Sequence, residues 1–123
     1  MAKILIVDDD AEIREFIKFA LKKEGYELDD AGSGKEALKK ILEFKPDLML
    51  LDIMMPILDG YSVCKILRDD PKYSPSPKII ILTARDSEWD RKLSELVEAD
   101  SFVAKPFKPE DLISKIEKTL KAN

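Results

Sequence analysis

The chain alternates five times between a short, mostly apolar segment and a longer amphipathic one, and this alternation limits its fold more than any other feature. Three of the short segments consist almost wholly of Ile, Leu, Val and Met, as in strands buried on both faces of a sheet. The longer segments repeat apolar residues at helical spacing. Strands and helices in alternation predict a parallel sheet with helices on both faces, an α/β fold. The predicted strands are residues 3–7, 26–31, 47–52, 78–83 and 101–104.

Capping and breaking residues mark the ends of the predicted helices. Gly25 stands where the first helix should stop, and Pro46 breaks the second. Ser33 and Glu36 have the spacing of a capping box that opens the second helix. We expect the apolar stripe of each helix to lie in the core. The stripes are Ile13, Phe16, Ile17, Ala20 and Leu21; Ala37, Leu38, Ile41 and Leu42; the apolar residues of 60–68; Trp89, Leu93, Leu96 and Val97; and Leu112, Ile113, Ile116 and Leu120.

Length and charge limit the classes of function. A chain of 123 residues predicts a single domain over residues 1–123. Its net charge of −4 argues against nucleic acid as a direct partner, because binding to DNA or RNA requires a basic face. We expect neither a membrane span nor a signal peptide. The lone cysteine, Cys64, permits no internal disulfide, which suits a reducing cytoplasm, and we expect it in the core.

The residue types that the chain lacks narrow its chemistry. There is no histidine, which excludes Ser–His and Cys–His nucleophile pairs and most zinc sites. Any chemistry must therefore use carboxylates, hydroxyls and lysines. There is also no glutamine, and the one asparagine is Asn123. Few thermolabile amides beside abundant Lys and Glu are typical of thermophilic proteins, so we expect a thermophilic source.

Reactive side chains stand where the predicted strands end. Functional groups of a doubly wound sheet gather outside the carboxyl ends of its strands, so we expect these side chains to share one edge. They are Asp8 and Asp9, Asp52, Thr83 and Lys105. The neighbouring Asp10 is better explained as the N-cap of the first helix, because one helix needs only one cap.

This predicted cluster carries an unbalanced charge. Three carboxylates and one ammonium have a net charge of −2, and like charges held close together raise a carboxyl pKa or recruit a cation. Oxygen ligands on a shallow rim favour Mg2+, which keeps several waters and leaves positions open for phosphate oxygens. A carboxylate beside a metal and a lysine suits phosphoryl transfer, which depends mostly on positioning and charge neutralisation.

Four motifs occupy these strand ends. They are Val7-Asp8-Asp9, the run DIMMPILDG over residues 52–60, Thr83-Ala84 and Lys105-Pro106-Phe107. Together, in this order and spacing, they resemble the signature of response-regulator receiver domains of bacterial two-component systems. The resemblance covers nearly the whole chain. It implies a flavodoxin-like, doubly wound, five-stranded parallel sheet in the order 2-1-3-4-5 with five helices.

The resemblance also implies a role for each residue of the pocket. Asp52 would be the nucleophile that forms an aspartyl phosphate. Asp9 and Asp52 would bind Mg2+ directly, together with the backbone carbonyl of Met54, while Asp8 would act largely through water. Lys105 would pair with Asp52 and then with a phosphoryl oxygen.

Further residues would form the switch. Thr83 would turn toward the phosphoryl group and the aromatic ring of Phe102 would move with it, although tyrosine is more common at that position. The Lys105–Pro106 peptide bond would be cis. Glu98 departs from the pattern, because the family usually has glycine there, and a left-handed helix end at a glutamate would be strained or reshaped.

These roles describe a signalling switch rather than a turnover enzyme. A histidine kinase would supply the phosphoryl group, and the surface of the fourth helix, fifth strand and fifth helix would signal to an effector or phosphotransfer protein. The chain would act in the cytoplasm as a monomer or a phosphorylation-dependent dimer, away from membranes.

Three alternatives remain open from the sequence. An aspartate-nucleophile phosphatase of the haloacid-dehalogenase type carries a second acid two residues after the nucleophile, where this chain has Met54. A binding module that is never phosphorylated would not need the full set of Asp9, Asp52, Thr83 and Lys105. The chain could also be one part of a DNA-binding regulator. The sequence names neither the kinase nor the target.

Overall fold

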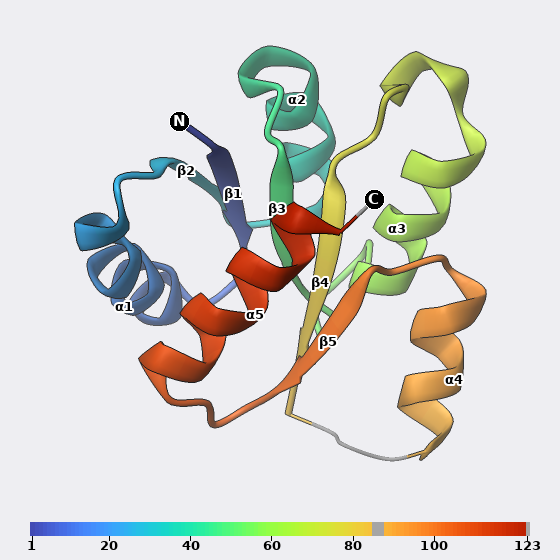
Figure 1. Cartoon of the computed structure of the whole chain (residues 1–123). Helices are drawn as coiled ribbons and strands as arrows, with labels where there is room; N and C mark the ends of the chain where they lie inside the picture. The colour runs from blue at the N-terminus through green and yellow to red at the C-terminus, as the bar shows by residue number, and fades with distance from the viewer. Residues whose placement is uncertain (85–87, 123) are drawn as a thin grey trace.

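The computed structural model describes residues 1–84 and 88–122. Its five strands form one parallel sheet in the order β2-β1-β3-β4-β5, which confirms the predicted flavodoxin-like fold (Figure 1). The strands are β1 (Lys3–Val7), β2 (Glu27–Ala31), β3 (Leu48–Asp52), β4 (Lys78–Thr83) and β5 (Ser101–Ala104). The helices are α1 (Ala11–Leu21), α2 (Gly34–Phe44), α3 (Gly60–Asp69), α4 (Glu88–Leu96) and α5 (Pro109–Lys121), with short 3-10 helices at Lys22–Glu24 and Pro71–Tyr73.

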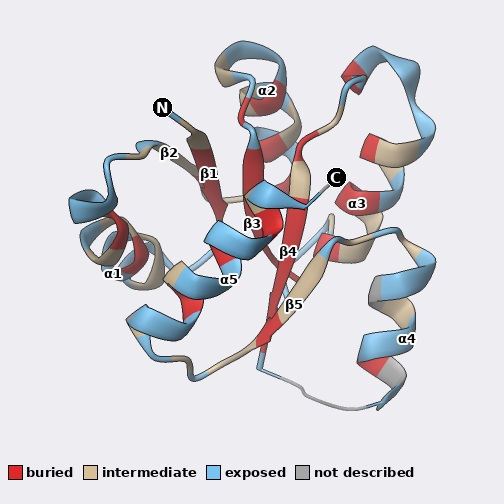
Figure 2. Ribbon diagram, viewed as in Figure 1, coloured by how far each residue is buried: buried red, intermediate tan, exposed pale blue. Residues whose placement is uncertain are grey.

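The helices cover the sheet in two layers (Figure 1). Because successive side chains of a strand point to opposite faces, each central strand contributes to both layers. Helices α1 and α5 pack over one face and α2 and α3 over the other. The strands β1, β3 and β4 are buried along almost their whole length between them (Figure 2). Each fully buried Ile or Leu contributes about 1.5–3 kcal/mol to folding, so this double burial stabilises the domain.

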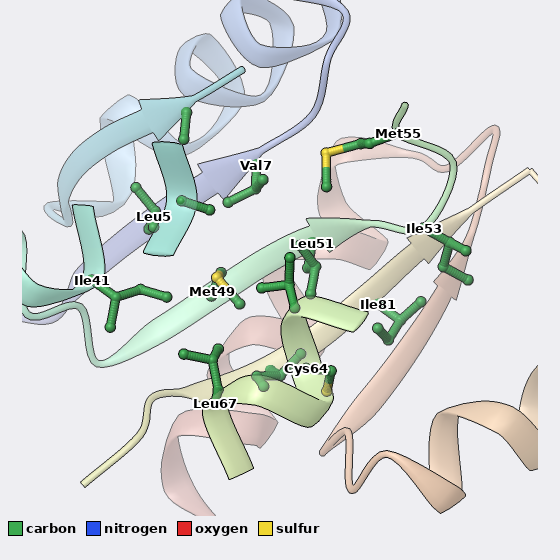
Figure 3. Packing of buried hydrophobic residues seen from close by; sticks show 14 of the residues in the cluster. Leu5, Val7, Ile41, Met49, Leu51, Ile53, Met55, Cys64, Leu67 and Ile81 are labelled. Carbon is green, nitrogen blue, oxygen red and sulfur yellow. The ribbon is translucent and has the colours of Figure 1, made fainter. Parts of the chain in front are cut away.

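The layer beneath α2 and α3 contains the single cysteine. Met49 and Leu51 of β3 lie opposite Cys64 and Leu67 of α3 (Figure 3). The Cys64 thiol is fully buried and donates a hydrogen bond to the carbonyl of Val97 at 3.2 Å. Burial raises the pKa of this thiol to about 11, so it is a core residue, as expected, and not a nucleophile.

Among the expected core residues whose side chains the structure describes, a set that does not include Trp89, three are exposed instead. Phe16 of α1 is 50% exposed, Leu42 of α2 is 40% exposed and Leu96 of α4 is 76% exposed. Each lies at the margin of the apolar stripe of its helix. The sheet covers only the middle of that stripe, so residues at its margin stay exposed. Helix α4 packs over the edge strand β5, where little sheet remains to bury it (Figure 1). Among the described residues, no helix combines the length and apolar character needed to cross a membrane.

The predicted helix boundaries have clear local causes. Ser33 Oγ accepts the Glu36 N–H at 3.1 Å, and the Glu36 carboxylate accepts the N–H of Gly32 at 3.3 Å, so the capping box is displaced by one residue. Gly25 is left-handed, with φ of 81°, but one 3-10 turn separates it from the end of α1. Helix α2 ends at Phe44, two residues before Pro46, as predicted.

Glu98, between α4 and β5, adopts the left-handed conformation that its sequence position suggested. Its φ is 61°, a value that L-residues with a Cβ rarely adopt. Arg68 of α3 holds this turn: Nε and Nη2 donate to the Glu98 carbonyl at 3.1 and 2.8 Å, and Nη2 donates to the Asp100 carboxylate at 2.9 Å. Asp100 also accepts the N–H of Ile79 at 2.7 Å. The turn is therefore strained but anchored through its main chain.

We predict that Glu98→Gly stabilises the domain by about 0.5–1 kcal/mol. The left-handed strain of about 1–2 kcal/mol disappears, and the extra flexibility of glycine in the unfolded chain offsets about 0.5–1 kcal/mol of that gain. The bonds from Arg68 remain, because they use the carbonyl of residue 98. Urea unfolding checks the change. Glu98→Ala is the matched control, since it removes the same side chain but keeps Cβ, and an equal gain in that variant would contradict the explanation.

Candidate functional site

The predicted reactive residues come together where the loops to α1, α3, α4 and α5 leave the sheet (Figure 1). Val7 pairs with Leu51, so Asp8 follows β1 beside Asp52, the last residue of β3. Thr83 is the last residue of β4 and pairs with Ala104, so Lys105 comes directly after that pair. The parallel register alone therefore collects these side chains at one edge.

The three carboxylates form a compact group. One oxygen from each of Asp8, Asp9 and Asp52 lies within 4.8 Å of the others. Asp8 is 1% exposed and Asp52 is 4% exposed, whereas Asp9 is open to solvent. Asp10 stands apart: its carboxylate accepts the Glu12 N–H at 2.9 Å and caps α1. The structure thus separates one capping acid from three acids that could share an ion.

Lys105 supplies the positive charge of the pocket. Its Nζ lies 3.4 Å from Asp52 Oδ1, the pair that the resemblance implied, and still closer to Asp8, at 2.8 Å from Oδ2. Its backbone N–H donates to the carbonyl of Thr83 at 2.7 Å, which fixes it to the end of β4. The Lys105–Pro106 peptide bond is cis. The ammonium group therefore lies between the two buried carboxylates.

Burial and mutual repulsion shape the ionisation of the pocket. Burial of Asp52 and the charge of Asp8 raise the pKa of the Asp52 carboxyl, although Lys105 and the backbone N–H of Met54 oppose that shift. Burial would lower the pKa of Lys105, but the hydrogen bond to Asp8 and the charge of Asp52 raise it. The lysine stays charged, so among the described residues one ammonium group faces three carboxylates. This donor set of hard oxygens fits Mg2+.

The residues expected to switch share one face of the sheet. Phe102 pairs with Ile81 and Thr83 pairs with Ala104, so both side chains point to the face that α3 and α4 cover. Thr83 is fully buried, and Phe102 is half-buried with the guanidinium of Arg91 5.7 Å from its ring centroid. The aromatic ring therefore lies on the same face of the sheet as Thr83 and beside Arg91 of α4.

The loop between β3 and α3 contains a close contact that sequence reasoning did not anticipate. A Cβ on Gly60 would lie 2.4 Å from the carbonyl oxygen of Asp52, so only glycine fits there. The Gly60 N–H also donates to the carbonyl of Ile53 at 3.0 Å. Asp59 caps α3 by accepting the N–H of Ser62 at 2.8 Å. The Asp-Gly pair signals a turn in any sequence, but its approach to Asp52 appears only in the folded chain.

We predict that Asp52→Asn raises the melting temperature at pH 7 in metal-free buffer. Because folding raises the pKa of Asp52, the folded state holds this proton more tightly than the unfolded chain, and ionisation opposes folding. This penalty is absent below the ordinary pKa of 3.8 and develops as the pH rises above it. The gain should therefore vanish at low pH.

Thermal unfolding of the wild type and of Asp52→Asn, at pH 7 and below pH 3.8, measures the difference in melting temperature. Asp10→Asn serves as the control, since it removes an exposed charge next to the pocket and asparagine caps a helix equally well. A lower melting temperature for Asp52→Asn at pH 7, or a gain that persists in acid, would contradict the electrostatic account.

Comparison with known proteins gives one consistent result. Residues 4–117 match the response regulator receiver domain family. The chain is 41% identical over 119 residues to the alkaline phosphatase synthesis transcriptional regulatory protein PhoP of Bacillus subtilis, and the match covers 97% of this chain and 48% of PhoP. The chain therefore spans about half the length of that relative.

Solved structures agree with this match. The chemotaxis protein CheY4 of Vibrio cholerae superposes with a TM-score of 0.89 at 33% identity, and the match covers 97% of this chain and 98% of CheY4. DrrB, an OmpR/PhoB homologue of Thermotoga maritima, superposes with a TM-score of 0.86 at 28% identity over 98% of this chain and 53% of its own. The chain belongs to the response-regulator receiver domain family.

Proposed function

We propose that this receiver domain, over residues 1–123, is a Mg2+-dependent switch that accepts a phosphoryl group on Asp52. The observation that carries the proposal is the group of three carboxylates within 4.8 Å of one another, with Lys105 against the two buried ones. One lysine leaves a net charge of −2, which a divalent cation would neutralise. Asp9, Asp52 and the Met54 carbonyl would hold Mg2+ directly, and Asp8 largely through water. When bound, Mg2+ would neutralise charge on the transferring phosphoryl oxygens.

Asp52 is the nucleophile in this proposal. Its carboxylate oxygen attacks the phosphorus of a phosphohistidine on a histidine kinase, the P–N bond breaks, and an acyl phosphate forms while the histidine leaves with the electron pair. The 123 residues contain no histidine, so this domain cannot itself carry the phosphohistidine donor. Asp52 is almost fully buried at the strand end, and this burial would keep most water away from the acyl phosphate.

Lys105 and Thr83 respond to the new charge. The phosphoryl group adds about two negative charges, which attract the Lys105 ammonium away from its ion pair with Asp8. The Thr83 hydroxyl, at the end of the next strand, turns to donate a hydrogen bond to a phosphoryl oxygen. The chemistry ends there, since this switch turns over no substrate other than its own phosphate.

Phe102 carries the signal to the surface. The ring lies on the same face as Thr83, so movement of Thr83 leaves space for the ring to move inward. That movement would take the ring away from the guanidinium of Arg91 on α4. The surface of α4, β5 and α5 then differs between the two states, and a downstream effector or phosphotransfer protein reads the difference.

The cellular location and the oligomeric state of the switch are inferred from its proposed partners. A histidine kinase as donor and a protein as target place the domain in the cytoplasm, without direct contact with nucleic acid or membrane, as a monomer or a phosphorylation-dependent dimer. The scarcity of amide side chains supports a thermophilic source. Met54 stands where a haloacid-dehalogenase phosphatase has its second acid, so we favour the switch over that enzyme.

We predict that acetyl phosphate with Mg2+ adds one phosphoryl group to the protein and none to Asp52→Asn. Intact-mass spectrometry measures the adduct, and a chelator should abolish it because the pocket would keep its unbalanced charge. Asp47→Asn is the matched control: it removes an exposed carboxylate just before the same strand and keeps an oxygen to accept the Lys3 N–H. Full phosphorylation of Asp52→Asn would reject Asp52 as the acceptor.

A further inference from the structure

We infer that Arg14 is a positioning residue that sets the spacing of Asp8 and Asp9 for metal binding. Arg14 lies in α1, and its Nη1 donates a hydrogen bond to the main-chain carbonyl of Asp8 at 2.7 Å. Its Nε donates to Asp30 Oδ2 of β2 at 2.8 Å. The inference rests on the proposed function, because it concerns how the same pocket is held ready for Mg2+.

The guanidinium group of Arg14 is held from several sides. Asp30 also pairs with Lys18 at 2.9 Å, but through Oδ1, the carboxylate oxygen that Arg14 does not use. Burial would raise the pKa of Asp30, but hydrogen bonds from Lys18 and Arg14 lower it, so the acceptor is ionised at neutral pH. A Cβ on Gly32 would lie 3.2 Å from Nη1, so the guanidinium packs closely against that glycine. Arg14 thus has little freedom.

The main chain of Asp8 is anchored at both ends. Its N–H donates to the carbonyl of Ala31 at 3.2 Å, and its carbonyl accepts from Arg14. That carbonyl belongs to the planar peptide unit that carries the N–H and Cα of Asp9. Because the unit is rigid, fixing the Asp8 carbonyl also fixes the point from which the exposed Asp9 side chain leaves the chain.

The spacing matters because Mg2+ requires near-ideal octahedral geometry. If Arg14 were lost, the Asp8 carbonyl would turn toward water and the Asp9 oxygen would no longer lie within 4.8 Å of the other two for most of the time. A purely electrostatic role gives the opposite result: the positive charge of Arg14 repels a cation, so its removal should tighten Mg2+ binding. The sign of the change therefore separates positioning from charge.

Calorimetric Mg2+ titration of the whole chain tests the inference with four proteins: the wild type, Arg14→Ala, Arg14→Lys and Lys18→Ala. We expect Arg14→Ala to weaken Mg2+ binding about tenfold, as is usual for residues that orient metal ligands. Arg14→Lys should also weaken it, because a point charge cannot reach both acceptors as the planar group does. Lys18→Ala is the matched control, since it removes one cation from the same Asp30 and should leave the affinity unchanged.

A second readout needs no metal. The Asp10 N–H donates to Asp8 Oδ1 at 2.9 Å, so its hydrogen exchange reports the order of this loop. We expect faster exchange in Arg14→Ala than in the wild type or Lys18→Ala. Three results would overturn the positioning role but leave the proposed function standing. They are wild-type Mg2+ affinity in Arg14→Ala, tighter Mg2+ binding in Arg14→Ala, and an equal loss of affinity in Lys18→Ala. Failure of the wild type to bind Mg2+ would overturn the proposed function, and this inference with it.

Discussion

The register of three parallel strands is the constraint on which the site depends. Val7 pairs with Leu51 and Asp52 with Leu82, so the chain can bring Asp8, Asp52 and Thr83 together without any contact between their side chains. A slip of one residue in β3 would turn Asp52 toward the other face of the sheet and move each apolar side chain of this strand into the opposite core layer, where it would not fit. The apolar core that fixes the register therefore also fixes the position of Asp52.

The pocket works against the stability that this core provides. Asp8 and Asp52 are almost fully buried, and one ammonium group serves both. Burying like charges is unfavourable unless a cation accompanies them. A site in this condition favours any ligand that restores neutrality, and it reorganises when the charge changes. The same electrostatic imbalance thus underlies both the proposed affinity for a metal and the proposed response to a phosphoryl group.

Most of the fold could be predicted from the sequence, because buried parallel strands read as continuous apolar runs with clear ends. The residues of the pocket could be predicted for the same reason: Asp8, Asp52 and Lys105 stand where those runs stop. The sequence could not predict that Asp8 is the closer partner of Lys105. This depends on distances of 2.8 and 3.4 Å, which no sequence pattern encodes.

Long-range contacts and local strain were also hidden from the sequence. Arg14 reads as a solvated helix residue, yet its contact with Asp30 crosses 16 positions of the chain. Ile57 adopts φ of 71° at full exposure, in a three-residue turn that the Leu58 N–H closes onto the Pro56 carbonyl at 2.8 Å. A β-branched residue is the least expected choice for that conformation, and neighbouring residues gave no sign of it.

In the proposed switch, Asp52 belongs to a carboxylate cluster whose excess negative charge a divalent cation neutralises. The most direct measurement is the melting temperature of the wild type and of Asp52→Asn as Mg2+ concentration rises. We expect the wild type to become steadily more stable, as for any ligand that binds only the folded state, and the variant to gain little. A wild-type melting temperature that does not respond to Mg2+, or an equal response in the variant, would contradict the proposal.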